Sequence, residues 1–207
     1  MLTEKWNEWN SSGAPKYPNN KLIQFMLRSY PTEIRNTIKV LDLGCGSGAN
    51  TVFLAEEGFK TYASDISSVG VEKTKLLIFN KNLRMEEIKL ESISKISYSD
   101  NFFDCVISIG VYDSAGMIEA RKSTKEISRV LKQGGKAFLL FAANDDFRIA
   151  NNTLNIHGYS DTEVTEMFQT SAFAKVYVDH YRTTYANQTQ LQHDYIITLF
   201  KWENISA

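Results

Sequence analysis

Residues 40–48 read VLDLGCGSG, a short apolar strand that runs into three alternate glycines. The next residues, 49–57, have helical spacing, so this stretch predicts a buried strand, a tight turn and the start of a helix. Glycine suits such a turn because it adopts positive φ angles at little cost and has no Cβ to hold a ligand away from the backbone. We therefore expect a large ligand to lie against the main chain here.

Asp65 follows Gly44 by 21 residues, at the end of the next predicted strand, 61–64. From that place a carboxylate can accept hydrogen bonds from both hydroxyls of a ribose. The turn and the carboxylate together indicate a cofactor that contains adenosine.

Two classes of enzyme compete for this pattern, because Gly44-x-Gly46-x-x-Ala49 also fits the dinucleotide fingerprint. Asp42, two residues before the first glycine, separates them. Its carboxylate would repel a pyrophosphate but suits the cationic amino and sulfonium groups of S-adenosyl-L-methionine. The residues favour this methyl donor; an NAD(P)-dependent oxidoreductase is the alternative, and a non-catalytic donor-binding regulatory or partner subunit is a third hypothesis.

Strands and helices alternate along the rest of the chain. A helix is predicted from residue 19 or 20 to about 30, and other helices over 69–80, over 160–170 and ending at 126–131. Further strands are predicted over 88–91, 105–109, 136–141, 174–178 and 195–202. No helix of crossover length separates the last two strands, so they are expected to form an antiparallel hairpin. The predicted fold is α/β, with a doubly wound, mostly parallel seven-stranded sheet and this C-terminal hairpin.

Over roughly residues 38–178 the chain resembles the class I S-adenosylmethionine-dependent methyltransferases. The resemblance rests on the turn at 40–48, the approaches to the fourth and fifth strands, and the helix and turn near the last strands, that is on residues 40–48, 98–107, 129–135 and 159–173. It looks most like the small-molecule branch with a methyltransferase domain. It implies a Rossmann-like methyltransferase fold and S-adenosyl-L-methionine as cofactor.

The resemblance also implies a set of cofactor-binding residues. Asp42 would lie near the amino group of the donor, Ile66 on the adenine face, and Ile109 would offer its carbonyl to the methionine ammonium. Ser92 stands where the family often has an acidic residue that contacts the adenine, so Ser92 and the backbone of Ile93 are expected to recognise this base. The full set is Asp42, Gly44, Cys45, Gly46, Gly48, Asp65, Ile66, Ser92, Ile93 and Ile109.

The candidate catalytic residues follow the predicted strands, because ligands of open α/β sheets bind beyond the carboxyl ends of the strands. Tyr112 and Asp113 contact the acceptor on one interpretation; on the other, Asp113 caps a helix and Tyr112 is a packed aromatic. His157 is either a base or a surface residue. Asp145 and Asp146 are expected to form a solvated loop, and no metal site is predicted.

The whole chain, 1–207, is expected to be one methyltransferase domain with its core over 38–202. Residues 1–30 would form an irregular arm, up to residue 18, and then a helix. Trp6, Trp9 and Tyr17 are too aromatic for an idle tail, so we expect the arm to dock, either as plain core or as a lid over the cleft.

Composition restricts the partners. Lys and Arg number 23 against 24 for Asp and Glu, a net charge of −1, which gives no general attraction for nucleic acid. The sequence shows no apolar run of membrane-spanning length and no signal peptide, so a cytoplasmic protein with no membrane association is expected. The expected partner is a small-molecule methyl acceptor, and the chain is expected to be a monomer or homodimer.

Overall fold

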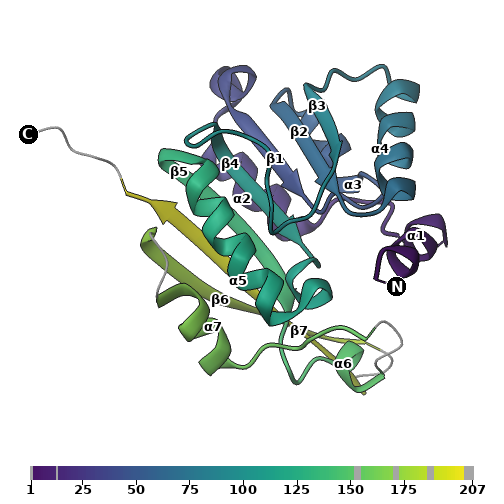
Figure 1. The fold of residues 1–207 in the computed structure, drawn as a ribbon, viewed down its shortest axis with the longest axis vertical. Helices are drawn as coiled ribbons and strands as arrows, with labels where there is room; N and C mark the ends of the chain where they lie inside the picture. Colours follow the sequence, from purple (N-terminus) through teal and green to yellow (C-terminus); the bar gives the residue numbers. More distant parts are fainter. Residues whose placement is uncertain (1, 13, 152–154, 170–172, 186–188, 203–207) are drawn as a thin grey trace, which may run out of the picture.

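The fold is taken from a computed structural model that describes residues 2–12, 14–151, 155–169, 173–185 and 189–202. Its centre is a seven-stranded sheet with the order β3-β2-β1-β4-β5-β7-β6 (Figure 1). The strands are β1 (Lys39–Leu43), β2 (Lys60–Asp65), β3 (Glu87–Leu90), β4 (Phe103–Ile109), β5 (Leu131–Ala142), β6 (Phe173–Tyr185) and β7 (Gln190–Lys201). The first five strands pair in parallel, whereas β7 runs antiparallel to both β5 and β6. The predicted fold class and the C-terminal hairpin are confirmed.

Helices cover both faces of the sheet. They are α1 (Leu2–Ser12), α2 (Asn20–Ser29), α3 (Ala49–Glu56), α4 (Ser68–Asn80), α5 (Tyr112–Val130), α6 (Phe147–Asn151) and α7 (Asp161–Gln169), with a 3-10 turn over Thr32–Thr37. Val40 of β1 belongs to the apolar cluster that includes α2 and α3, while Leu41 and Leu43 belong to the cluster that includes α5 and α7. Both faces of β1 are therefore buried, and each face carries apolar side chains.

Polar caps fix where several helices begin. Asn19 accepts hydrogen bonds from the first turn of α2, and Ser67 accepts one from the backbone of α4. Ser160 and Glu163 form a reciprocal capping box at α7: each side chain accepts from the backbone N–H of the other residue. The caps of α2 and α7 were predicted from the sequence, and the starts of these two helices agree with the prediction.

The prediction of an irregular arm over 1–18 is wrong for residues 2–12, which form α1. Trp6, Asn7, Trp9 and Asn10 recur at helical spacing, so one face of this helix meets the body. Asn7 Oδ1 accepts from Ser67 Oγ at 2.7 Å, beside the start of α4. Figure 1 shows α1 next to α4. Docking of this kind stabilises a helix that would be marginal alone.

The last strands are longer than predicted. The ladder of β6 and β7 continues to Tyr185 and Gln190, beyond the point where Ala142 of β5 pairs with Asp194. The extension is mostly polar, so it carries no apolar alternation that would mark a strand. It brings the first residues of β7 to the carboxyl edge of the parallel strands.

Candidate functional site

A cavity of about 630 Å³ opens at the carboxyl ends of β1 and β4, where the strand order reverses. Crevices at such switch points are the usual ligand sites of open α/β sheets. Its wall is formed by the glycine turn, by the residues after β2, β3 and β4, by parts of β5, α6 and β7, and by α1 with the segment that follows it. The chain thus brings segments that are far apart in the sequence around one space.

The glycine turn has the backbone that only glycine adopts readily. The φ angles are +82° at Gly44, +53° at Gly46 and +88° at Gly48. The close neighbours of these glycines are protein side chains: a Cβ on Gly44 would lie 2.3 Å from Val111 Cγ2, and one on Gly48 would lie 2.7 Å from Thr74 Oγ1. Gly44 and Gly46 line the cavity, whereas Gly48 lies outside the lining and serves the packing of α3 against α4.

Asp65 ties the turn to the start of α4. One carboxylate oxygen accepts from Gly46 N and the other from Ser67 N, both at 2.7 Å. The side chain is 8% exposed and lines the cavity, and burial raises the pKa of its carboxyl. The carboxylate is therefore held at the cavity wall with lone pairs left for a ligand.

Asp42 lies behind the turn and not in the cavity wall. Its side chain is 1% exposed and accepts a hydrogen bond from Thr51 Oγ1 at 2.6 Å. Burial raises the pKa of Asp42 to about 7, although the Thr51 hydrogen bond opposes the rise, and the charge of Asp65 adds to it. Asp42 is not among the residues that line the cavity, and its hydrogen bond to Thr51 joins β1 to α3 behind the turn.

The buried Asp42 predicts a pH dependence of stability. Between pH 4 and 7 the folded protein keeps a proton that the unfolded chain releases, so the free energy of unfolding falls as the pH rises through this window. In Asp42→Asn an amide oxygen still accepts from Thr51 while the titration is gone. Urea unfolding should show that the free energy of unfolding of the parent protein falls by on the order of 3 kcal/mol between pH 4.5 and 7.5 because of Asp42. The variant should lack this part of the fall. The surface variant Asp100→Asn should keep the loss, and an unchanged pH dependence in Asp42→Asn would contradict the assignment.

The remaining residues predicted to bind cofactor all lie in the cavity wall: Cys45, Ile66, Ser92, Ile93 and Ile109. Ile66 is 37% exposed and offers an apolar face beside Asp65. Ser92 Oγ lies 2.9 Å from Ser94 Oγ. All the cofactor-binding residues that the resemblance implied therefore line the cavity, except Asp42 and Gly48.

The three candidate catalytic residues separate in the structure. Asp113 lines the cavity and is 4% exposed; burial raises its pKa to about 6, partly offset by the charge of Arg148. Tyr112 lies outside the wall, with its hydroxyl 3.0 Å from Thr124 Oγ1, as the packed-aromatic interpretation expects. His157 also lies outside it and pairs with Glu163 at 3.0 Å. Asp113 is the one of the three that faces the cavity.

The polar residues of the wall that were not predicted include Arg148 from α6, and Gln192 and Asp194 from β7. Arg148 pairs with both Asp146 and Asp194. Asp146 is 1% exposed, so the expectation of a solvated loop is wrong for this residue; its carboxylate is compensated by the guanidinium. The antiparallel hairpin was the available signal, because the first residues of β7 must lie at the same edge as the end of β5.

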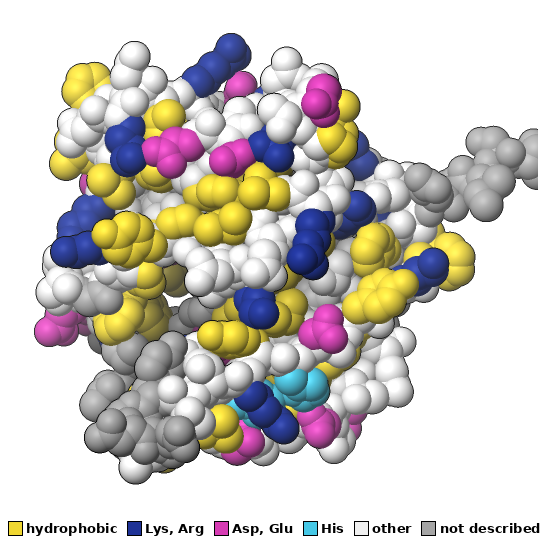
Figure 2. All heavy atoms as spheres, turned by 180° about the vertical axis from the view of Figure 1, so that it is seen from behind, with side chains coloured by type: hydrophobic (Ala, Val, Ile, Leu, Met, Phe, Trp, Pro, Cys, Tyr) yellow, Lys and Arg dark blue, Asp and Glu magenta, His cyan; other side chains and the backbone are white. Residues whose placement is uncertain are grey.

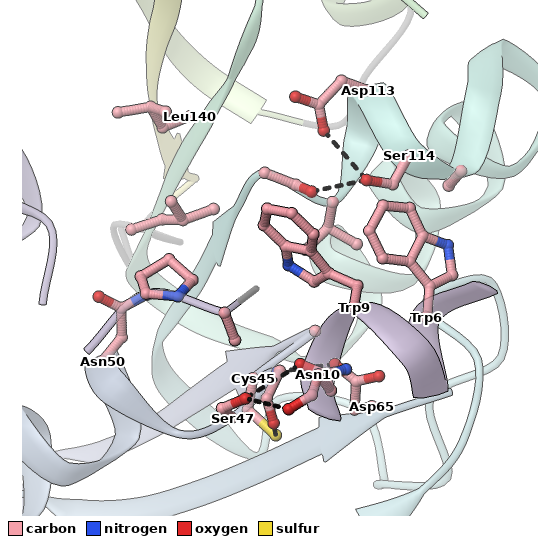
Figure 3. Close-up of a pocket in the computed structure, with 18 of the residues that line it drawn as sticks. Trp6, Trp9, Asn10, Cys45, Ser47, Asn50, Asp65, Asp113, Ser114 and Leu140 are labelled. Atoms are coloured by element: carbon pink, nitrogen blue, oxygen red, sulfur yellow. Dashed lines mark hydrogen bonds between the residues drawn. The ribbon is translucent and has the colours of Figure 1, made fainter. Parts of the chain in front are cut away.

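The N-terminal aromatic residues face the cavity. Trp6, Trp9 and Tyr17 are part of its wall. Figure 3 shows the two indoles extending from α1 between Asp65 on one side and Ser114 on the other. Asn10, beside them, accepts from Ser47 Oγ through its side chain at 3.2 Å and through its carbonyl at 3.3 Å. Helix α1 is thus joined to the glycine turn itself.

Comparison with known proteins indicates the family. A family model for the methyltransferase domain matches residues 41–139, from the strand before the glycine turn to the middle of β5. Over these residues the chain is similar to the class I S-adenosylmethionine-dependent methyltransferases, as the sequence predicted. S-adenosyl-L-methionine is the cofactor of this family, so the predicted family and cofactor are confirmed.

Several proteins that are similar to this chain are named as methyltransferases. The human EEF1A lysine methyltransferase 2 is 31% identical over 132 residues, which cover 60% of this chain and 54% of that protein. The demethylmenaquinone methyltransferase of Clavibacter sepedonicus is 31% identical over 99 residues, 47% of this chain and 38% of that one. A SAM-dependent methyltransferase from Methanosarcina mazei has the same fold, with a TM-score of 0.69 at 19% identity, covering 90% of this chain and all of that one. The chain spans about half the length of the curated relatives it matches.

The cavity of this chain fits the cofactor of that family. Its volume lies within the roughly 300–1,000 Å³ typical of small-ligand sites. Asp65 and the apolar Ile66 stand together, as a ribose and an adjoining base require, and acidic side chains outnumber basic ones in the wall, which suits a sulfonium. In the part of the chain that the structure describes, no cluster of three or more His, Cys, Asp or Glu could hold a metal ion. Nor does any helix there have the length and apolarity to cross a membrane.

The indoles in the cavity wall predict a spectroscopic response. Binding of S-adenosylhomocysteine should change the tryptophan fluorescence, because Trp6 and Trp9 would pass from a solvated to a ligand-filled cavity. The double variant Trp6→Phe/Trp9→Phe should lose nearly all of this change. Trp202, 61% exposed at the far end of β7, supplies the control: Trp202→Phe should keep it. A response lost in Trp202→Phe and kept in the double variant would rule out this placement of α1.

Proposed function

We propose that the chain transfers a methyl group from S-adenosyl-L-methionine to an oxygen, nitrogen or sulfur atom of a small molecule. One observation carries the proposal: a single cavity joins the glycine turn and Asp65 at one end to Asp113, Arg148 and Asp194 at the other. A donor and an acceptor can therefore meet within one enclosed space. When bound, the donor supplies an electrophilic methyl group on a positively charged sulfur.

The residues of the chain would bind and position the two substrates. Asp65 would hold the ribose hydroxyls, Ile66 would pack on the adenine, and Ser92 with the backbone of Ile93 would contact its edge. The carbonyl of Ile109 would accept from the methionine ammonium. Methyl transfer is an in-line displacement, so holding the reacting atoms in line within a space that excludes water supplies most of the rate enhancement.

Helix α1 is proposed to close the cavity as a lid. Its two indoles lie over the space, and Lys73 of α4 clamps its end by donating to the carbonyls of Asn10 and Ser11 at 2.6 and 2.7 Å. Because these contacts are hydrogen bonds that water can replace, the helix can detach to admit ligands and dock again. A lid of this kind restricts the acceptor to a molecule that fits beneath it, which supports the small-molecule proposal.

Surface charge supports the same proposal. On the face shown in Figure 2, Lys, Arg, Asp and Glu side chains are interspersed. Binding of nucleic acid draws on a clustered basic surface. The names of the relatives do not indicate which class of methyl acceptor to expect, since one relative is named for a lysine and another for demethylmenaquinone.

The proposal is tested by supplying the protein with methyl-labelled S-adenosylmethionine and, separately, a deproteinised metabolite extract, a protein fraction and a nucleic-acid fraction. Label is expected in the metabolite fraction. Label confined to protein or nucleic acid would overturn the small-molecule acceptor. Binding of S-adenosylhomocysteine without transfer to any fraction would favour the regulatory-subunit hypothesis instead.

A further inference from the structure

The acceptor end of the cavity holds more negative than positive charge. Asp113 and Asp194 both line it and are 4% and 0% exposed, and Asp146 lies just behind them at 1%. Arg148 is the one basic side chain in the described wall of the cavity. Three buried carboxylates thus share a single guanidinium.

The pairing leaves Asp113 without an ionic partner. Arg148 bonds to both oxygens of Asp146 and to one oxygen of Asp194, whose other oxygen accepts from Gln192 Nε2 at 2.6 Å. Asp113 forms no ion pair within the described residues. It accepts a hydrogen bond of 3.3 Å from the backbone of Ala142 and one of 3.5 Å from the hydroxyl of the adjacent serine, and the charge of Arg148 offsets only part of the effect of burial on its pKa.

Uncompensated buried charge is costly unless a partner of opposite sign supplies what water no longer does. The cost here falls if a cation enters the cavity, since Asp113 and Asp194 both face it and lie close enough for their charges to interact. An anionic acceptor would be repelled from the same place. The indoles of Trp6 and Trp9 add aromatic faces to the wall, which also attract cations.

We propose that the methyl acceptor is a primary or secondary amine whose ammonium group binds to Asp113 and Asp194. This inference rests on the proposed function. Asp113 and Asp194 are then catalytic residues that contact the substrate, and Arg148 is a positioning residue that holds Asp194 in place.

The chemistry of an amine acceptor requires one proton to leave before the new bond forms. The ammonium gives this proton to the Asp113 carboxylate, which later releases it to water. The freed lone pair of the nitrogen forms the N–C bond while the C–S bond of the sulfonium breaks, and the electron pair of that bond stays on sulfur. Burial raises the pKa of Asp113 to about 6, so this group accepts a proton more readily than an exposed aspartate does.

The test separates acceptors by charge. A deproteinised metabolite extract is divided by ion exchange at neutral pH into cationic, neutral and anionic fractions, and each is incubated with the protein and methyl-labelled S-adenosylmethionine. Label is expected in the cationic fraction, in products that still bind a cation exchanger. Label in the anionic fraction, or in a neutral product that contains no amine nitrogen, overturns the amine acceptor and leaves the methyltransferase intact, whereas no label in any fraction removes the proposed function and this inference with it.

Variants then test the two carboxylates. Asp113→Asn and Asp194→Asn keep the side-chain shape and should each lower kcat/KM for the cationic fraction by about 10- to 100-fold, the worth of a hydrogen bond to a charged group. The affinity of both variants for S-adenosylhomocysteine should change little. The melting temperature should change little in Asp113→Asn and fall in Asp194→Asn, which loses the ion pair with Arg148. Asp145→Asn, in the loop between β5 and α6 with its carboxylate outside the cavity wall, is the control that should keep activity. Full activity in both Asp113→Asn and Asp194→Asn would overturn the assignment.

Discussion

Replacing Asp65 by alanine should weaken the binding of S-adenosylhomocysteine by about 100-fold or more, because two charge-assisted hydrogen bonds to ribose hydroxyls would be lost. The variant also removes the acceptor of Gly46 N and of Ser67 N. The glycine turn then loses its tie to α4, and its cavity-facing backbone is no longer held in place. Calorimetric titration of the folded variant measures the loss directly.

The control for Asp65→Ala is a carboxylate at the other end of the same cavity. Asp113→Asn should bind S-adenosylhomocysteine within about twofold of the parent, since Asp113 is assigned to the acceptor. Melting curves of both variants show whether the loss reflects unfolding. Equal binding by Asp65→Ala and the parent would contradict the placement of the ribose at Asp65.

Gly44→Ala should destabilise the fold by about 3 kcal/mol or more and should also impair cofactor binding. The positive φ of +82° disfavours any Cβ, and this Cβ would lie 2.3 Å from Val111 Cγ2. Relief of that contact must push Val111, at the end of β4, or the turn itself out of position. Both line the cavity, so stability and binding should fall together.

Gly58 provides a matched comparison for the strain alone. It has nearly the same φ, +84°, at the turn between α3 and β2, and a Cβ there would meet nothing within 4 Å. Gly58→Ala should therefore cost only about 1–2 kcal/mol and leave the affinity for S-adenosylhomocysteine unchanged. If urea unfolding gave the two variants the same loss of stability, crowding at Gly44 would not be the cause.

The sheet could be predicted from the sequence because its central strands are buried on both faces. Residues 39–43 and 105–109 are short, mostly apolar runs, and glycines or polar caps mark where the next elements begin. The same logic fails where a strand is polar. The outer halves of β6 and β7 pair with each other beyond the end of β5. Their residues show no apolar alternation from which a strand could be predicted.

Helix α1 was missed for a related reason. Its helical spacing lies in two tryptophans and two asparagines, and asparagine is a poor helix former in isolation. The helix is instead stabilised by tertiary contacts, in which Asn7 bonds to Ser67 and Asn10 to Ser47. Such tertiary contacts cannot be predicted from helix propensity alone.

The donor end of the site was more predictable than the acceptor end. Gly44, Gly46 and Asp65 belong to one strand-turn-helix-strand unit, so their spacing in sequence carries their arrangement in space. Arg148 and Asp194 lie 46 residues apart and meet only because β7 runs back along β5. Asp42 was expected at the ligand, yet its carboxylate turns to Thr51 and lies behind the turn.

The central claim is that the cavity at the ends of β1 and β4 binds the methyl donor. Isothermal titration of the parent protein with S-adenosylhomocysteine tests it most directly, with NADH titrated in parallel. One molecule of S-adenosylhomocysteine should bind per chain with a dissociation constant in the micromolar range, and NADH should give no binding heat. Saturable binding of NADH with none of S-adenosylhomocysteine would contradict the account.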